Sequence, residues 1–234
     1  MTRVFKGLPL GILLLGATML TVSCLTEHAR VRLMDASPNT PNLDVLVDGK
    51  MVVTNGTYES ATSYLKFSSG SRHFEVRATG TTTDLIDTKA TLAAHKDYTF
   101  LAVNSLPITP AVLTPLALTD DNSAPASGQV KVRLIQASPT AGSVDVYLIT
   151  PPGPLTGSPT VTNLAYQAAT SYQSVAAGSY EVFVTPTGAT TPVLFDSGPL
   201  TLTAGQIRTG VTLDDPGGGT ITPPGVFVVL ADLN

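Results

Sequence analysis

The chain contains the same sequence pattern twice, and this repeat limits the folds it can adopt more than any other feature. The stretch "RVRLMDASPNTPNLDVLVDG" over residues 30–49 returns as "KVRLIQASPTAGSVDVYLIT" over residues 131–150. Further along, "ATSY" at 61–64 returns at 169–172. Because the matches keep their order along the chain, we expect a tandem duplication of one module.

Within each copy, apolar residues alternate with polar ones as they do in β-strands. Val31 and Leu33 flank Arg32, and "HFEVRA" and "SYEVFV" alternate in the same way. Turn-forming stretches such as "SPNTPN" and "SSGS" separate these runs, and no run of a dozen residues carries a helical stripe. We therefore predict an all-β fold of two tandem immunoglobulin-like or transthyretin-like antiparallel β-sandwich modules, each of about seven strands. A chain with one Cys and no Trp lacks the Cys–Trp–Cys core of true immunoglobulin domains, so only the architecture is predicted.

The N-terminus has the form of an export signal. Basic "MTRVFK" precedes the apolar run "GLPLGILLLGATML", which is shorter than the roughly 20 residues of a spanning helix. The run ends in "TVSC", which resembles the bacterial lipoprotein signal. That resemblance implies cleavage between Ser23 and Cys24 and a diacylglycerol on the Cys24 thiol. The alternative is ordinary secretion, with Cys24 removed or left as a free thiol.

The signal and the repeat together give a domain map. The segment between the copies, "DNSAPASGQ", is small and polar, and a flexible linker of about nine residues spans roughly 15–18 Å. We therefore expect two neighbouring modules on a short flexible thread. The predicted map is a lipoprotein signal peptide over 1–23, a lipidated tether over 24–29, the first β-sandwich repeat over 30–121, the linker over 122–129 and the second repeat over 130–234.

Each copy is similar to the bacterial module catalogued as domain of unknown function 4397. The opening of that family reads much like "VRxxHASPDAPxVDVYVDG", and here it stands as "VRLMDASPNTPNLDVLVDG" and "VRLIQASPTAGSVDVYLIT". The resemblance implies an exported, β-rich domain, often tandem or lipid-anchored, with no established activity. The family's His before "ASP" is replaced by Asp35 and Gln136, so no role of that imidazole transfers to this chain.

The residues shared by the two copies are predicted to be structural. The serine of each "ASP" can cap its own turn, where the proline fixes φ. The aspartate of each "DV" can accept backbone N–H groups from the preceding loop. A metal or ligand carboxylate is the alternative, although one acid per loop is few for calcium, which takes 6–8 oxygens. The shared positions are Ser37, Pro38, Asp44, Tyr64 and Gly70 in the first copy and Ser138, Pro139, Asp145, Tyr172 and Gly178 in the second.

The tyrosine and glycine positions of this signature carry more specific expectations. The tyrosine that ends each "ATSY" is expected to be buried with its hydroxyl bonded to backbone, as at a sandwich corner. An exposed tyrosine that binds a ligand is the alternative. Gly70 and Gly178 are expected at hairpin positions with positive φ.

The sequence lacks the patterns that carry chemistry. Its only histidines, His28, His73 and His95, are scattered, and neither a nucleophile elbow nor metal-ligand spacing is present. With a net charge of −4 and no Lys/Arg block, the chain also lacks the charge pattern of nucleic-acid binders. We therefore expect no catalytic residue, no metal and no cofactor, and partners limited to the membrane, through the lipid anchor, and an envelope protein or polysaccharide.

Three functions compete at this point. The first is a non-catalytic, lipid-anchored cell-envelope protein whose two modules serve binding, adhesion or spacing, on the outer membrane or cell surface if the organism has two membranes. The second is a glycan-binding accessory module, in which Tyr147, Tyr166 and Tyr172 would form a stacking surface, although Trp is absent. The third, an envelope hydrolase, requires a catalytic cluster that the sequence does not show.

Overall fold

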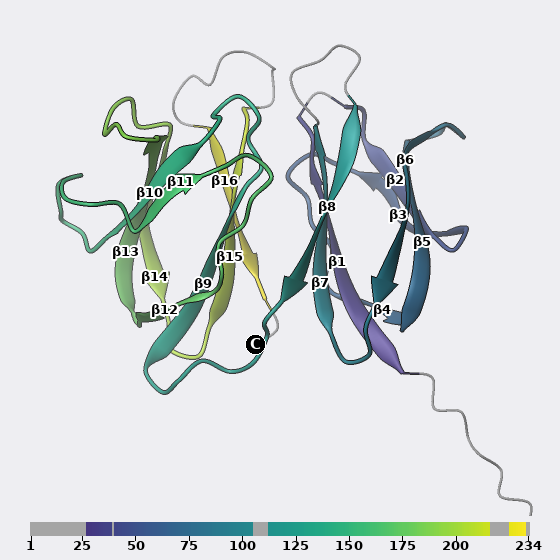
Figure 1. Cartoon of the computed structure of the whole chain (residues 1–234), viewed down its shortest axis with the longest axis horizontal. Coiled ribbons are helices and arrows are strands. Elements are labelled where there is room, and N and C mark those ends of the chain that lie inside the picture. The colour runs from purple at the N-terminus through teal and green to yellow at the C-terminus, as the bar shows by residue number, and fades with distance from the viewer. Residues whose placement is uncertain (1–26, 39, 105–111, 216–224, 233–234) are drawn as a thin grey trace, which may run out of the picture.

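The computed structural model describes residues 27–38, 40–104, 112–215 and 225–232. Within these ranges every regular element is a β-strand, and the sixteen strands form four four-stranded sheets. The predicted all-β architecture of two sandwich modules is confirmed (Figure 1). The predicted signal peptide and Cys24 lie outside the described residues.

The first sandwich contains eight strands, one more than the approximate number predicted. Its inner sheet has the order β4-β1-β7-β8 and its outer sheet the order β3-β2-β5-β6. The strands are β1 (His28–Ala36), β2 (Leu43–Val47), β3 (Lys50–Gly56), β4 (Leu65–Ser68), β5 (Gly70–Ala78), β6 (Asp84–Leu92), β7 (Asp97–Asn104) and β8 (Leu113–Asp120).

The second sandwich repeats this strand order. Its inner sheet runs β12-β9-β15-β16 and its outer sheet β11-β10-β13-β14. The strands are β9 (Gln129–Gln136), β10 (Val144–Ile149), β11 (Val161–Leu164), β12 (Gln173–Ala176), β13 (Gly178–Pro186), β14 (Phe195–Leu202), β15 (Ile207–Leu213) and β16 (Val226–Ala231).

Each inner sheet contains one parallel pair among otherwise antiparallel strands. β1 runs parallel to β7, and β9 runs parallel to β15. Parallel strands are usually covered on both faces, and β7 and β15 are buried along almost their whole length. The inner sheets must therefore have a second partner besides their own outer sheets.

One face of each inner sheet forms the interior of its own sandwich. In the first, Val31 and Leu33 of β1 pack around Phe74 and Phe100, whose rings stack with centroids 4.5 Å apart. In the second sandwich the stacked pair is Phe195 and Phe227, and the ring of Phe227 from β16 lies over Gly210. A Cβ at Gly210 would lie only 2.3 Å from that ring, so the glycine makes room for it.

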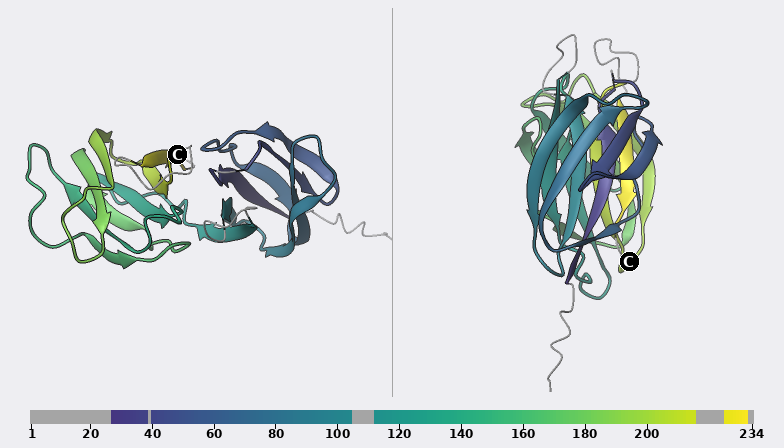
Figure 2. Two further views of the ribbon diagram at one scale, coloured as in Figure 1. Left: turned by 90° about the horizontal axis from the view of Figure 1, so that it is seen from above. Right: turned by 90° about the vertical axis from the view of Figure 1, so that its right-hand side faces the viewer.

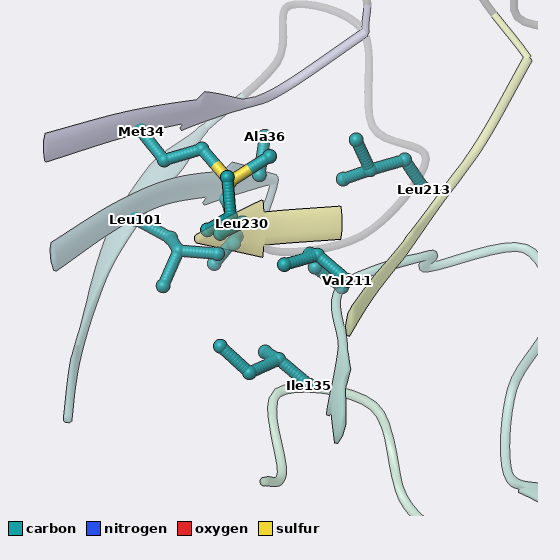
Figure 3. Close-up of a cluster of buried hydrophobic side chains, with 9 residues drawn as sticks. Met34, Ala36, Leu101, Ile135, Val211, Leu213 and Leu230 are labelled. Atoms are coloured by element: carbon teal, nitrogen blue, oxygen red, sulfur yellow. The ribbon is translucent and has the colours of Figure 1, made fainter. Parts of the chain in front are cut away.

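The other face of each inner sheet packs against the opposite sandwich. Figure 3 shows apolar side chains from both halves of the chain in one cluster, and Figure 2 shows the sandwiches side by side. The two halves are therefore not beads on a flexible thread, because they share a buried core. That cluster contains Met34, Ala36, Leu101 and Val103 from the first sandwich and Ile135, Ala137, Val211, Leu213 and Leu230 from the second.

Candidate functional site

Beside this shared apolar cluster, the interface between the sandwiches buries a group of charged side chains. Asp120, where β8 ends, forms an ion pair of 2.7 Å with Arg133 of β9. Its other oxygen accepts hydrogen bonds from Tyr64 Oη (2.5 Å) and Thr99 Oγ1 (2.7 Å). The side chain of Asp120 is 0% exposed and that of Arg133 is 3% exposed, so the pair is closed to solvent.

A second group with the same composition lies across the interface. Asp232, just after β16, pairs with Arg32 of β1 at 2.7 Å, with both side chains buried. It also accepts hydrogen bonds from Tyr172 Oη (3.0 Å) and Thr209 Oγ1 (2.9 Å). Each arginine therefore pairs with a carboxylate of the other sandwich: the first sandwich supplies the arginine of one pair and the aspartate of the other. We call the two groups together the ionic joint.

The aromatic rings complete the ionic joint. The guanidinium of Arg32 lies 5.0 Å from the centre of the Tyr64 ring, and that of Arg133 lies 4.7 Å from the Tyr172 ring. Burial raises the pKa of the Tyr64 hydroxyl far above its ordinary value, with the charge of Asp120 adding to the effect. Both tyrosines therefore remain neutral hydrogen-bond donors. A closed cluster of this kind fixes geometry and leaves no room for a substrate.

The sequence interpretation missed these four ionic residues. The alternation around Arg32 suggested a side chain that faces solvent, whereas Arg32 is only 2% exposed. The available signal was the repeat itself, since both copies carry "VRL" in their first strand and an aspartate after "LT" or "LA" in their last. A charge kept at the same position of two strands is typical of a paired group.

The tyrosines of "ATSY" are half-buried, but their hydroxyls bond to carboxylates of the ionic joint, not to backbone as expected. The predicted glycan surface does not form, because Tyr147 is buried in β10 and Tyr172 lies under Arg133. Tyr166 donates its hydroxyl hydrogen to the backbone oxygen of Asn104 in the first sandwich. It too belongs to the interface.

The "ASP" turns are held by local hydrogen bonds. The Asp35 carboxylate accepts both the N–H (3.0 Å) and the hydroxyl (2.6 Å) of Ser37. In the second copy, Gln136 Oε1 accepts the N–H of Ser138 at 2.9 Å, and the Ser138 hydroxyl accepts the N–H of Ala141. The residue before "ASP" therefore supplies an acceptor in both copies. Each turn then continues through its proline, Pro38 or Pro139.

The aspartates of "DV" bind backbone N–H groups, although not those of the preceding loop as expected. Asp44 accepts N–H groups of Asn55 (2.8 Å) and Gly80 (3.4 Å), and Asp145 accepts those of Asn163 and Gly188 (2.8 Å each). All of these donors follow the aspartate in sequence, so the expectation of the preceding loop was wrong. The N–H of Asn55 lowers the pKa of Asp44 below its usual value.

The two hairpin glycines differ from each other. Gly70 has φ of 100°, as expected for its turn. Gly178 is not among the positive-φ residues, so the expectation was wrong there. The second copy makes its reversal without a left-handed residue at this position.

The histidines lie in two places: His73 is on the outer sheet, whereas the N–H of His95 donates to the backbone oxygen of His28 (2.8 Å) at the start of β1. His73 Nε2 lies 2.6 Å from Asp87 on the face of β5 and β6 in the outer sheet. His95 lies in the turn before β7, where its Nε2 is 3.9 Å from Glu27. Among the described residues, no group of three or more His, Cys, Asp or Glu side chains is placed to hold a metal ion. Within the same ranges, no helix is long and apolar enough to cross a membrane.

Three hollows in the described part of the chain are considered as places where a ligand could bind. Two lie inside the sandwiches, with volumes of about 130 Å³ and 70 Å³, and are lined almost wholly by core side chains. The third is an open cleft of about 500 Å³ at the start of β1. Its lining is charged and consists of Glu27, His28, Arg30, Lys66, His95, Lys96 and Asp97. We call it the basal cleft.

Solved structures with related shapes are distant. A streptococcal virulence factor described as binding alpha-glucan shares 10% identity at a TM-score of 0.28, over 81% of this chain and 95% of that one. The module CBMbc (family CBM26) of Eubacterium rectale, in complex with maltoheptaose, shares 10% at 0.27, over 88% and 98%. A leucine-rich repeat protein of Bacteroides thetaiotaomicron shares 14% at 0.20, over 78% and 25%. TM-scores this low carry no conclusion about fold or function.

Sequence comparison is more specific. No curated protein sequence matches this chain. The family model described as "Domain of unknown function (DUF4397)" matches residues 29–147, about half of the chain. That span contains the first sandwich from the second residue of β1 onward, the linker, β9 and most of β10. The chain therefore belongs to the DUF4397 family, whose function is unknown.

Proposed function

We propose that this protein is a non-catalytic, lipid-anchored component of the cell envelope whose two sandwiches form one rigid body. That body would serve as a platform for binding, adhesion or spacing. The observation that carries the proposal is the interface, where a shared apolar cluster and two buried ion pairs join the sandwiches. Independent binding modules would not need buried charges to fix their mutual orientation.

The second sandwich, in this proposal, is a second copy of the family module. It has the strand order of the first, including the parallel pair in its inner sheet. Asp44 and Asp145 also bind backbone N–H groups at equivalent places in their sheets. Duplication of a module that pairs with itself explains why the ionic joint has two similar halves.

The position of the tether favours a platform over a long spacer. β1 begins at one end of the first sandwich, and in Figure 1 the strands run across the long axis of the molecule. A lipid at Cys24 would therefore hold the body with its sandwiches side by side along the membrane. The opposite ends of the strands, including the "ASP" turns, would point away from the membrane.

The anchor is tested by labelling growing cells with a clickable fatty acid and separating membrane from soluble fractions. The wild-type protein is expected in the membrane fraction with the label, because the acyl chains insert into the bilayer. Cys24→Ala is expected to lose the label and the processing, whereas Thr26→Ala, two residues away, should keep both. A labelled, processed Cys24→Ala protein would contradict the proposal.

A further inference from the structure

We propose that the basal cleft binds the anionic phosphate groups of lipids in the membrane to which the protein is anchored. This inference rests on the proposed lipid anchor. The cleft is formed by the beginning of β1, by β4 and by the turn before β7. Lys66 lies directly across from Arg30 in the β1–β4 pairing, and Asp97 lies across from Arg30 on the other side.

The charges of the basal cleft leave two lysines available. Arg30 makes two hydrogen bonds to Asp97, of 2.7 Å and 2.9 Å, so these charges neutralise each other. Glu27 lies near His95. Lys66 and Lys96 are exposed, and neither forms an ion pair within the described residues. An anion entering the cleft would therefore meet the ammonium groups of Lys66 and Lys96, with Glu27 as the one further carboxylate in the lining.

The fold itself does not require these lysines. In the second sandwich, Ser174 pairs with Lys131 as Lys66 pairs with Arg30. Gln206 precedes β15 as Lys96 precedes β7. The same scaffold thus carries uncharged side chains at both positions, and only the sandwich next to the tether carries the cations.

His95 is a second side chain of the cleft that differs from its counterpart in the second sandwich. Its φ is 59°, in the left-handed region that favours glycine. The corresponding residue of the second sandwich is Gly205, with φ of 88°. Non-glycine residues in this conformation are strained and cluster at functional sites. The side of the basal cleft therefore carries an imidazole where the second sandwich has a glycine.

The length of the tether identifies the occupant. Glu27 follows Cys24 by three residue steps, so the extended chain between them can span at most about 10 Å. Acyl chains on Cys24 would hold the cleft within about one Debye length of the phosphate layer of the same bilayer. A basic side chain at an anionic membrane surface strengthens binding about fivefold. Lipid headgroups are therefore the anions present at the highest local concentration.

The test uses the chain from residue 24 onward with Cys24→Ser, so that no acyl chain contributes to binding. Flotation is measured with vesicles of phosphatidylcholine, with and without phosphatidylglycerol, at low salt. We expect binding only to the anionic vesicles. Lys66→Gln with Lys96→Gln should weaken it about twentyfold, whereas the matched pair Lys50→Gln with Lys89→Gln on the outer sheet should leave it within twofold.

Three outcomes would overturn the inference. They are no flotation with anionic vesicles, equal weakening by both variant pairs, or loss of flotation when inorganic phosphate replaces chloride at equal ionic strength. The last would identify a free-anion site. Because the assay contains no acyl chain, it fails or succeeds independently of the labelling experiment on Cys24.

Discussion

At the scale of single residues, two arginines decide how the halves of this molecule meet. A buried ion pair is an uncertain source of net stability, because desolvation offsets the attraction between the charges. Its effect on the relative orientation of the two sandwiches is greater, since a buried charge without its partner is strongly unfavourable. Arg32 and Arg133 therefore exclude other orientations of the two sandwiches more than they strengthen the one observed.

This leads to a prediction for Arg32→Met. The substitution leaves Asp232 buried without its partner and should lower the free energy of unfolding by about 3–5 kcal/mol. The double variant Arg32→Met with Asp232→Leu should recover most of that loss. Urea unfolding of the wild-type, single and double variants measures both effects.

The matched control is Arg72→Met, which breaks the partly exposed pair with Asp48 on the outer sheet. It should lower the free energy of unfolding by less than about 1 kcal/mol. If Arg32→Met is no more damaging than Arg72→Met, the ionic joint has no special role.

At the scale of elements, the linker is attached to the second sandwich by a charge pair. Asp121 lies 2.7 Å from Lys131 of β9, and the Lys131 ammonium also donates to Ser123. The hydrogen bond from Lys131 lowers the pKa of Asp121 to about 2, with Ser123 adding to the effect. The linker that was expected to be a loose thread is therefore fixed at its start.

The pair predicts a pH dependence with a definite sign. Because the folded pKa of Asp121 lies below its ordinary value of 3.8, its stabilisation is complete above about pH 4 and is lost as the pH falls towards 2. The carboxylate is 56% exposed, so the effect should stay below about 1 kcal/mol. Urea unfolding of Asp121→Asn should show a deficit at pH 7 that disappears near pH 2. A deficit that is the same at both pH values would contradict this.

Strand elements also show what could be predicted from sequence. Alternation and turn residues identified the strands, because burial on one face leaves a period of two. The same alternation misplaced Arg32, since β1 is covered on both faces and its second face packs on the other sandwich. Periodicity shows that the two faces of a strand differ, but it does not show what packs against each face. The parallel pairing of β1 with β7 was beyond prediction for a related reason, as it joins strands far apart in sequence.

The candidate sites divide in the same way. Asp44 and Asp145 of the repeat signature accept backbone N–H groups, but the donors lie in a neighbouring strand and in a later turn that no local pattern connects to them. The basal cleft was missed because Lys66 and Lys96 are separated by two strands. Register alone brings them to the same end of the inner sheet.

At the scale of the whole molecule, the duplicated module has become one body. Each sandwich alone would expose the apolar side chains of the shared cluster together with an unpaired arginine. The pair covers both, and the tether attaches at one end of the first sandwich. The shared orientation of the two "ASP" turns therefore depends on rigid pairing, whereas the basal cleft lies within the first sandwich alone.

Distances between spin labels measure this rigidity directly. In a Cys24→Ser background, Lys89→Cys on β6 and Thr201→Cys on β14 place one exposed label on each outer sheet. Pulsed electron–electron resonance should give a single narrow distance distribution for the wild-type interface, and a broader one when Arg32→Ala and Arg133→Ala are added. A broad distribution with the wild-type interface would show that the sandwiches move independently, and would contradict the rigid platform.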